Sequence, residues 1–468
     1  MKQTFVIILM AITFGVSGQP KNDSSFFPIA VWLQNPSLAY EYKKAGVNLY
    51  IGNDNVDAGY LNTLRFAGMK LMCKQNAYAL AHLNDTLFYG WTQQDEPDNA
   101  QWNSVTKVYD SCINPSVVIG IYDTARSKDT TRPVYLNLGM GVAYTIWSGR
   151  GPCEGKINMY PVNKNGYLKG CDIASFDIYP VNSSDGAIRD NLWYVAKGID
   201  SLKSWTNNAK PVWTWIETTQ IDAGSLRKPT PQEVRSEVWI ALIHGVKGFG
   251  YFCHSWVPSF DEAAMYHDTA MYRGISEINH QVAALAPVLN SANTTGFASV
   301  SSSNTSVPVD MMTKHYHDTN YIFAVAMRKG TTTATFSVDS GKSAIVLGEN
   351  RTLKIENGSF TDTFTPYAAH LYKISSAEYV SSEPLLTVRV NVYPNPAGSL
   401  VNVDLPSDVP GSHFCLIDTQ GRICLNVLVQ PGLNSVTLGS DLSGTYIYTV
   451  TDASGNRITS GEIIINNK

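Results

Sequence analysis

The feature that most limits the fold is a regular alternation of short apolar strands and helical stretches between residues 26 and 290. Strand–helix alternation indicates parallel strands joined by crossover helices. Eight such units in about 260 residues predict a closed (β/α)8 barrel, the TIM barrel of the α/β class. An open doubly wound sheet is the alternative, but no G-x-G-x-x-G follows the first strand. The predicted strands are Ile29–Leu33, Val47–Gly52, Lys70–Gln75, Phe88–Gln93, Pro133–Asn137, Ile173–Tyr179, Pro211–Glu217 and Gly248–Cys253.

Two further blocks follow the barrel. Residues 294–375 show period-two alternation interrupted by Gly and Asn, which predicts a small antiparallel β-sandwich. Residues 376–386 are rich in Ser and polar, so they predict a linker. Residues 387–468 contain only short strand patterns and predict a second, Ig-like β-sandwich at the C-terminus.

The first 18 residues predict a signal peptide. Lys2 precedes the apolar run 5–14, and small residues at 16–18 offer a cleavage site. No later stretch is apolar enough to predict a transmembrane segment. We therefore expect an exported protein.

Seven cysteines are too few for a disulfide scaffold. In an oxidising compartment Cys153 and Cys171, which flank a Gly/Pro-rich loop, are the first candidates for a disulfide. Cys415 and Cys424 are the second candidates, and the sequence leaves the connectivity open.

Charge and composition narrow the classes of partner. Lys and Arg number 35 against 39 Asp and Glu, and no basic run appears, which argues against nucleic-acid binding. Charged residues make up only 16%, while Tyr numbers 25 and Trp 10. Few charges and many large aromatic rings suit an extracellular protein that binds sugars.

Two predicted strands end in a glutamate, and a barrel places its catalytic residues at such strand ends. Glu96 follows the fourth strand and Glu217 ends the seventh. We expect Pro97 to keep Glu96 extended, because the residue before proline is disfavoured in the α region. Alternation along the seventh strand puts Trp213 and Trp215 on the side of Glu217, as an apolar floor if Glu217 points inward.

Two carboxylates across a barrel mouth suit the cleavage of a glycosidic bond. One must be protonated to donate to the leaving oxygen, and the other must be ionised to attack or stabilise the anomeric carbon. At about 5 Å separation they repel, so the pKa of one rises and it holds its proton near neutral pH. A single rim glutamate is more simply explained by a salt bridge, but the occurrence of Glu at both strands favours a catalytic pair.

The barrel resembles the clan A glycoside hydrolases, a large group of retaining enzymes. The segments G-W-x-x-x-D-E-P at 90–97 and K-P-V-x-x-x-x-E at 210–217 resemble their acid/base and nucleophile strands, and D-I-Y-P at 177–180 resembles a further motif. The resemblance implies Glu96 as acid/base, Glu217 as nucleophile and Tyr179 as a residue that tunes the charge of the nucleophile. One departure is Asp95, where most of the clan have an Asn that contacts the sugar 2-hydroxyl; an ionised Asp accepts but does not donate.

Aromatic side chains are the predicted sugar platforms, because sugar rings present apolar C–H faces. Trp256, just after the eighth strand, is the first candidate, and Trp32 and Trp91 are weaker ones. His254 either hydrogen-bonds substrate or is a buried structural residue. No metal-ligand spacing, G-x-S-x-G or P-loop is present, so we expect neither a metal nor an organic cofactor.

The last block resembles the C-terminal sorting domain of the type IX secretion system. The resemblance rests on Y-P-N-P at 393–396 and L-x-G-x-Y at 442–446, and it covers the last ~80 residues. It implies the type IX machinery as a partner and export across the outer membrane to the cell surface or the medium.

Together these observations predict a secreted retaining glycoside hydrolase that cleaves β-linked polysaccharide. The aromatic content favours endo action across a long cleft. The alternatives are a non-catalytic glycan-binding or adhesin protein on the same scaffold, and an inverting glycosidase that uses Asp177.

Overall fold

The computed structural model describes residues 23–144, 159–377, 390–405, 412–418, 420–452 and 457–466. The predicted signal peptide and Cys153 lie outside these residues. The chain divides into two compact units, residues 1–379 and 380–468. Among the described residues no helix is both long and apolar enough to span a membrane.

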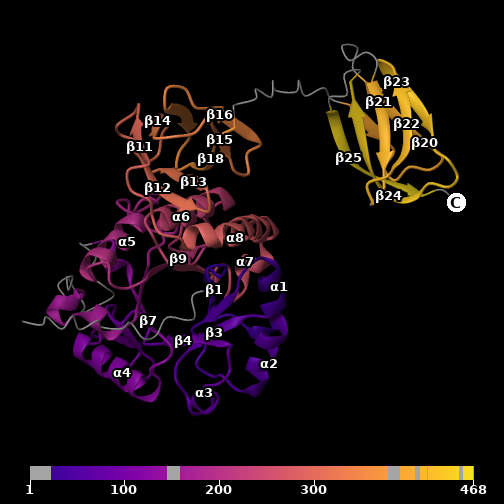
Figure 1. Cartoon of the computed structure of the whole chain (residues 1–468). Helices are drawn as coiled ribbons and strands as arrows, with labels where there is room; N and C mark the ends of the chain where they lie inside the picture. Colours follow the sequence, from indigo (N-terminus) through magenta and orange to yellow (C-terminus); the bar gives the residue numbers. More distant parts are fainter. Residues whose placement is uncertain are drawn as a thin grey trace, which may run out of the picture. The chain divides into compact units, whose positions relative to one another are not determined.

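A closed barrel of eight parallel strands forms the first part of the first unit, as predicted (Figure 1). Around the ring the order is β1-β10-β9-β8-β7-β4-β3-β2. The strands are β1 (Ile29–Trp32), β2 (Leu49–Ile51), β3 (Lys70–Cys73), β4 (Phe88–Thr92), β7 (Val134–Leu138), β8 (Ile173–Asp177), β9 (Val212–Glu217) and β10 (Gly248–Phe252).

Helices surround the strand ring (Figure 1). The helix before β10 has a well-defined start: Thr230 caps it, Pro231 is its first residue, and Glu233 completes a capping box. The helices are α1 (Ala39–Lys44), α2 (Ala58–Ala67), α3 (Ala77–Ala81), α4 (Pro115–Lys128), α5 (Tyr194–Trp205), α6 (Pro231–Ile243), α7 (Ala264–His267) and α8 (Thr269–Asn290).

The inside of the barrel is filled by its own side chains. Trp213 and Trp215, which alternation puts on one side of β9, point inward and lie against β10. Gly248 and Gly250 make room for them, since a Cβ there would lie 2.4 Å and 2.1 Å from the two indole rings. The interior cluster consists of Ala30, Leu49, Ile51, Met72, Tyr135, Ile173, Trp213 and Trp215.

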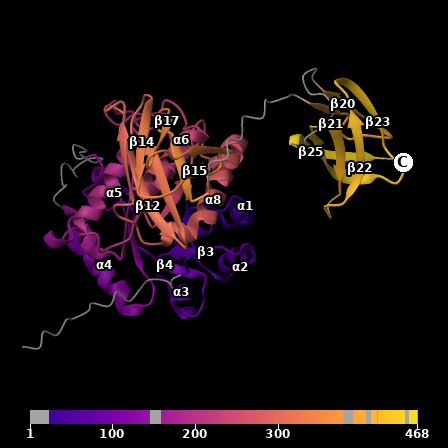
Figure 2. The ribbon, with the colours of Figure 1, turned by 45° about the horizontal axis from the view of Figure 1, so that its top comes forward.

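An antiparallel β-domain follows α8 and packs on α6 and α8 (Figure 2). Its core is continuous with that of the barrel, where Trp239 of α6 stacks on Phe323 at 5.5 Å between ring centroids. One sheet has the order β11-β14-β17 and the other β12-β13-β18-β15-β16. The strands are β11 (Ala298–Ser302), β12 (Val309–Tyr316), β13 (Thr319–Ala326), β14 (Thr332–Val338), β15 (Ser343–Val346), β16 (Arg351–Lys354), β17 (Ser359–Phe364) and β18 (Ala369–Ser375).

The second unit is a β-sandwich with its own core. Its sheets have the orders β19-β20-β23 and β22-β21-β24-β25. The strands are β19 (Asn391–Tyr393), β20 (Leu400–Leu405), β21 (Ser412–Ile417), β22 (Ile423–Val429), β23 (Gly432–Thr437), β24 (Ser443–Thr451) and β25 (Arg457–Asn466).

The two predicted disulfides are wrong. Cys171 is a free, buried thiol, and Cys415 and Cys424 are both free. Cys415 lies opposite Asn426 on the neighbouring strand, so Cys424 is displaced from it along the ladder. Cys112, which the sequence did not single out, is disulfide-bonded.

Candidate active site

Acidic side chains from different strands meet at the barrel mouth. Glu96 follows β4, Asp177 ends β8, and their carboxyl groups are hydrogen-bonded to each other. The Tyr179 hydroxyl donates to Asp177. Asp95 lies close enough to act on Asp177 electrostatically and accepts a 3.1 Å hydrogen bond from Nδ2 of Asn137, on β7. The sequence named Asp177 only as a competitor, whereas the structure places it against Glu96.

The backbone at Glu96 has a conformation that the sequence did not predict. Its φ is +40°, so the expectation that Pro97 keeps it extended is wrong. Its N–H donates to the Asn137 carbonyl at 3.1 Å, and its carbonyl accepts from the Asn99 N–H and Gln101 Nε2, both at 3.0 Å. Such a φ on a residue with a side chain costs about 1–3 kcal/mol, and the three hydrogen bonds hold it there.

Asp98 is a third acid of the same segment, and sequence reasoning missed it. Its carboxylate accepts the Gly139 N–H at 2.9 Å and the Tyr160 hydroxyl at 2.9 Å. Burial raises the pKa of Asp98 to about 7, and the charge of Glu96 adds to this against the two hydrogen bonds. Gly139 leaves space for Glu96, since a Cβ there would lie 3.0 Å from Glu96 Oε1. The sequence did hold a signal for Asp98, because the run D-E-P-D at 95–98 places three acids within four residues.

Burial and neighbouring charge keep a proton in this cluster. Burial raises the pKa of Asp177 well above its ordinary value, and the charges of Glu96 and Asp95 raise it further. Two carboxyl groups in contact cannot both ionise readily, so the Glu96–Asp177 pair holds one proton near neutral pH. A loaded acid at a barrel mouth is what general acid catalysis requires.

Glu217 has a different environment. It is fully buried. Its Oε1 accepts the Val181 N–H at 2.6 Å, and its Oε2 accepts the N–H and Nδ2 of Asn182 at 2.8 and 2.5 Å. Its carboxyl group also lies beside that of Glu237, on α6, and the two groups interact electrostatically. These contacts are with the loop after β8 and with a helix outside the barrel wall, and they differ from the contacts of Glu96.

Glu217 and Glu237 form a second carboxyl pair within the wall. Burial raises the pKa of Glu217 to about 7, against the lowering effect of the amide donors of Asn182 and Val181. Burial and the neighbouring Glu217 raise the pKa of Glu237 well above its ordinary value. This pair is also protonated near neutral pH, but it lies out of reach of solvent.

Aromatic rings line one side of the mouth. Tyr179 lies 5.3 Å from Phe252, and Phe252 stacks on Trp256 at 6.1 Å, both between ring centroids. Trp256 is 48% exposed, which leaves it open to a ligand. Trp32 packs on Trp215 at 5.2 Å, at the top of the barrel interior.

The two other predicted binding residues are buried. Trp91 is fully buried, packs on Phe88 and donates its indole N–H to Asp129 at the end of α4, 2.9 Å away. The prediction that Trp91 binds substrate is therefore wrong, because this face of β4 packs on the helices. His254 is 6% exposed and contacts Trp256 edge-on, and burial lowers its pKa. His254 is therefore a structural residue whose ring supports that of Trp256.

A hairpin after β4 carries exposed aromatic residues that sequence reasoning missed. Trp102 of β5 (Gln101–Asn103) and Tyr109 of β6 (Val108–Asp110) are 55% and 42% exposed and lie 5.2 Å apart. In the ring order β4 and β10 are four strands apart in either direction. The hairpin and Trp256 therefore emerge from opposite sides of the mouth.

Comparison with known proteins identifies the second unit. Residues 391–466 match the family described as "Secretion system C-terminal sorting domain". This match confirms the sequence prediction for the last block and indicates export by the type IX system to the cell surface or extracellular space. No protein of curated function matches the chain.

Solved structures with a similar course of the chain include three glycosidases. An alpha-amylase from Geobacillus thermoleovorans, complexed with acarbose, is 8% identical with a TM-score of 0.47, over 75% of this chain and 98% of that one. A family 30 endoxylanase from Clostridium papyrosolvens is 11% identical with a TM-score of 0.39, over 75% and 96%. A family 30 subfamily 8 xylanase from Clostridium acetobutylicum is 13% identical with a TM-score of 0.41, over 75% and 95%. These values are too low to assign an activity to this chain.

Proposed function

We propose that this protein is an exported glycoside hydrolase that cleaves a polysaccharide bound across the barrel mouth. The observation that supports it most is the group of acids at the ends of β4 and β8: Asp95, Glu96, Asp98 and Asp177. Glycosidic cleavage passes through a cationic, oxocarbenium-like transition state, which closely placed carboxylates stabilise. Acyl transfer develops an oxyanion, which the same acids would repel.

The roles follow from the contacts. Glu96 protonates the leaving oxygen, and Asp177 shares its proton and keeps the acid loaded. The Tyr179 hydroxyl, bonded to Asp177, fixes the direction of that carboxyl group. Asp95, held by Asn137, is placed to accept a hydrogen bond from a sugar hydroxyl.

The attacking group is the second part of the mechanism. Retaining enzymes hold their two carboxyl groups about 5 Å apart on opposite faces of the sugar, whereas Glu96 and Asp177 are in direct contact. The retaining scheme predicted from sequence uses Glu217, whose two oxygens are occupied and buried. We therefore propose water as the nucleophile: Glu96 gives its proton to the leaving oxygen, and the Asp95 carboxylate, held by Asn137, accepts the proton of the attacking water. Exchange with solvent then returns a proton to the Glu96–Asp177 pair. NMR of the first-formed anomer tests this: inversion supports it, and retention would restore Glu217 as nucleophile.

Endo action on a β-linked chain is part of the proposal. Trp102 and Tyr109 on one side of the mouth and Trp256 on the other give platforms on both sides of the acids. A chain bound at both ends is cut internally. Large oligosaccharides as the first products support endo action, and release of single terminal sugars contradicts it.

The test of the function is hydrolysis by the purified full chain. β-Glucans, galactans, mannans, xylans and host glycans serve as substrates, and Glu96→Gln serves as the inactive control. Hydrolysis that Glu96→Gln abolishes supports the proposal. Binding without turnover by the native chain would favour the glycan-binding or adhesin alternative instead.

A further inference from the structure

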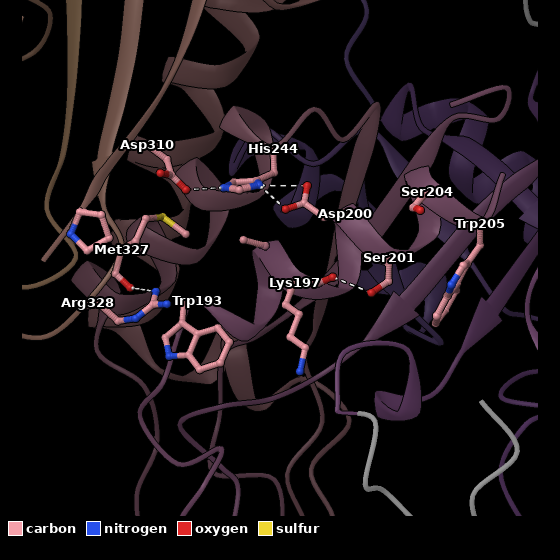
Figure 3. Close-up of a pocket in the computed structure, with 12 residues that line it drawn as sticks. Trp193, Lys197, Asp200, Ser201, Ser204, Trp205, His244, Asp310, Met327 and Arg328 are labelled. Atoms are coloured by element: carbon pink, nitrogen blue, oxygen red, sulfur yellow. Dashed lines mark hydrogen bonds and ion pairs between the residues drawn. The ribbon is translucent and has the colours of Figure 1, made fainter. Parts of the chain in front are cut away.

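A pocket lies on the outside of the barrel. It has a volume of about 500 Å³, within the usual range for ligand sites, and it lies between α5, the end of α6 and the β-domain (Figure 3). Residues at 193, 197, 201 and 205 recur every four positions, so they share one face of α5. The pocket is thus built on a helix outside the barrel wall, apart from the acids of the mouth.

The two ends of this helix face carry tryptophans. Trp193 and Trp205 are 12 residues apart, which at about 1.5 Å per residue places them about 18 Å apart along the helix. Trp205 stacks flat on Tyr160, with 4.9 Å between centroids and 2° between planes. Tyr160 thus covers one face of the indole and fixes its orientation. The distance between the tryptophans suits a short chain of sugar rings rather than a single ring.

Two cations are held beside Trp193. The Arg328 guanidinium lies 4.4 Å from the Trp193 ring, and Lys197 Nζ lies 5.2 Å from the Tyr194 ring. Trp193 and Tyr194 themselves stack at 4.1 Å. Figure 3 shows Lys197 and Arg328 flanking Trp193. Neither cation forms an ion pair with another residue of the described ranges.

The remaining charges of the pocket balance one another closely. His244 lies between Asp200 and Asp310, with 3.1 Å from Nδ1 to Asp200 and 3.2 Å from Nε2 to Asp310. Burial lowers the pKa of His244, but the two carboxylates outweigh it and raise the pKa to about 9. The pocket therefore holds two negative groups, Asp200 and Asp310, and three positive ones, which are protonated His244, Lys197 and Arg328.

We propose that this pocket binds an anionic oligosaccharide, with sugar rings along α5 toward Trp205 and a carboxylate or sulfate group held by Lys197 and Arg328. Cations fixed against aromatic rings lose little freedom on binding an anion, and charge-assisted hydrogen bonds are the stronger kind. Ser201 and Ser204, between the tryptophans, supply hydroxyls for the sugar. The site is independent of whether the mouth hydrolyses a glycan.

Calorimetric titration of the full chain carrying Glu96→Gln tests this site without turnover of the probe. The probes are trigalacturonate for a carboxylate, a sulfated carrageenan oligosaccharide for a sulfate, maltotriose as neutral sugar and inorganic sulfate as free anion. We expect one anionic oligosaccharide to bind, and the double variant Lys197→Gln/Arg328→Gln to weaken it about tenfold or more. Lys128→Gln, an exposed cation on α4, is the matched control and should leave binding unchanged.

Several results would overturn the site. One is that neither anionic oligosaccharide binds. Another is that the double variant binds the anionic oligosaccharide as tightly as the protein with Lys197 and Arg328 intact. A third is that maltotriose or inorganic sulfate binds as tightly as the anionic oligosaccharide. Trp205→Ala should also weaken binding, but Tyr160 beneath it bonds to Asp98 in the mouth, so the cation variants are decisive. Loss of hydrolysis with this binding intact would contradict only the proposed function.

Discussion

The ends of β4 and β9 look alike in sequence but differ in the folded protein. Both strands are rich in aromatic residues, and a glutamate lies at or shortly after the end of each: Glu96 after β4 and Glu217 at the end of β9. Glu96 is partly exposed and contacts Asp177 at the mouth, whereas Glu217 is fully buried and contacts Glu237 and the loop after β8. Both carboxyl groups lie beside a second carboxyl group, but of the two glutamates only Glu96 is partly exposed. A glutamate at a strand end is therefore a catalytic candidate only when its partners leave it accessible.

The largest expected effect is at the mouth. Glu96→Gln should lower kcat by about 10²–10⁴-fold, because Gln cannot donate a proton to the leaving oxygen. The matched control is Glu277→Gln, an exposed glutamate of α8, which should leave kcat unchanged. Equal kcat for Glu96→Gln and the native chain would break the comparison between the two strand ends.

Two tryptophans extend the comparison from acids to aromatic residues. Trp91→Ala should lower the free energy of unfolding by about 3–5 kcal/mol, since it empties a buried site and strips Asp129 of a donor. Trp256→Ala should leave Tm nearly unchanged and raise KM for long glycans about two- to tenfold through a lost platform. Thermal unfolding and KM measured on both variants check this, and a large drop in Tm for Trp256→Ala would contradict the assignment.

The sequence predicted the barrel, because its eight buried strands and the helices between them produce a regular pattern of apolar and polar residues. It also predicted that Glu96 and Trp256 lie at the barrel mouth, since strand ends and the aromatic residues beside them follow directly from the barrel, while their roles stay predictions. It did not predict the partner of Glu96: Asp177 reaches it only through the closure of the ring. Nor did it predict the burial of Glu217, which depends on Asn182 and on a helix outside the wall.

The Glu217–Glu237 pair predicts that the stability of the protein depends on pH. The pKa of Glu217 is raised to about 7 from an ordinary 4.5, so the unfolded chain releases this proton first as pH rises. The stability that the proton provides is full below about pH 4.5 and is lost as pH rises to about 7. Glu237→Gln leaves one titrating carboxyl with a neutral neighbour, so it should flatten the fall in Tm over this range. An unchanged slope in the Tm-against-pH curve would show that the pair does not share a proton.

The Glu96–Asp177 pair predicts the smallest of these effects, a shift in the pH profile of activity. Because the pKa of Asp177 is raised, the acid stays loaded above the ordinary carboxyl range and kcat/KM falls only as pH rises through that raised value. Asp98→Asn removes a neighbouring acid and should shift this alkaline limb to lower pH by a fraction of a unit, since less negative charge holds the proton. A shift to higher pH would contradict the electrostatic account.

Comparing kcat/KM of Asp177→Asn with that of Glu217→Gln measures directly which carboxyl group works with Glu96. Both variants are assayed at a temperature where circular dichroism shows each to be folded. We predict a loss of at least about 100-fold for Asp177→Asn. Glu217→Gln should lower Tm, because buried amide donors lose an acceptor, and retain most of its kcat/KM. A folded Glu217→Gln without activity, beside an active Asp177→Asn, would contradict the account.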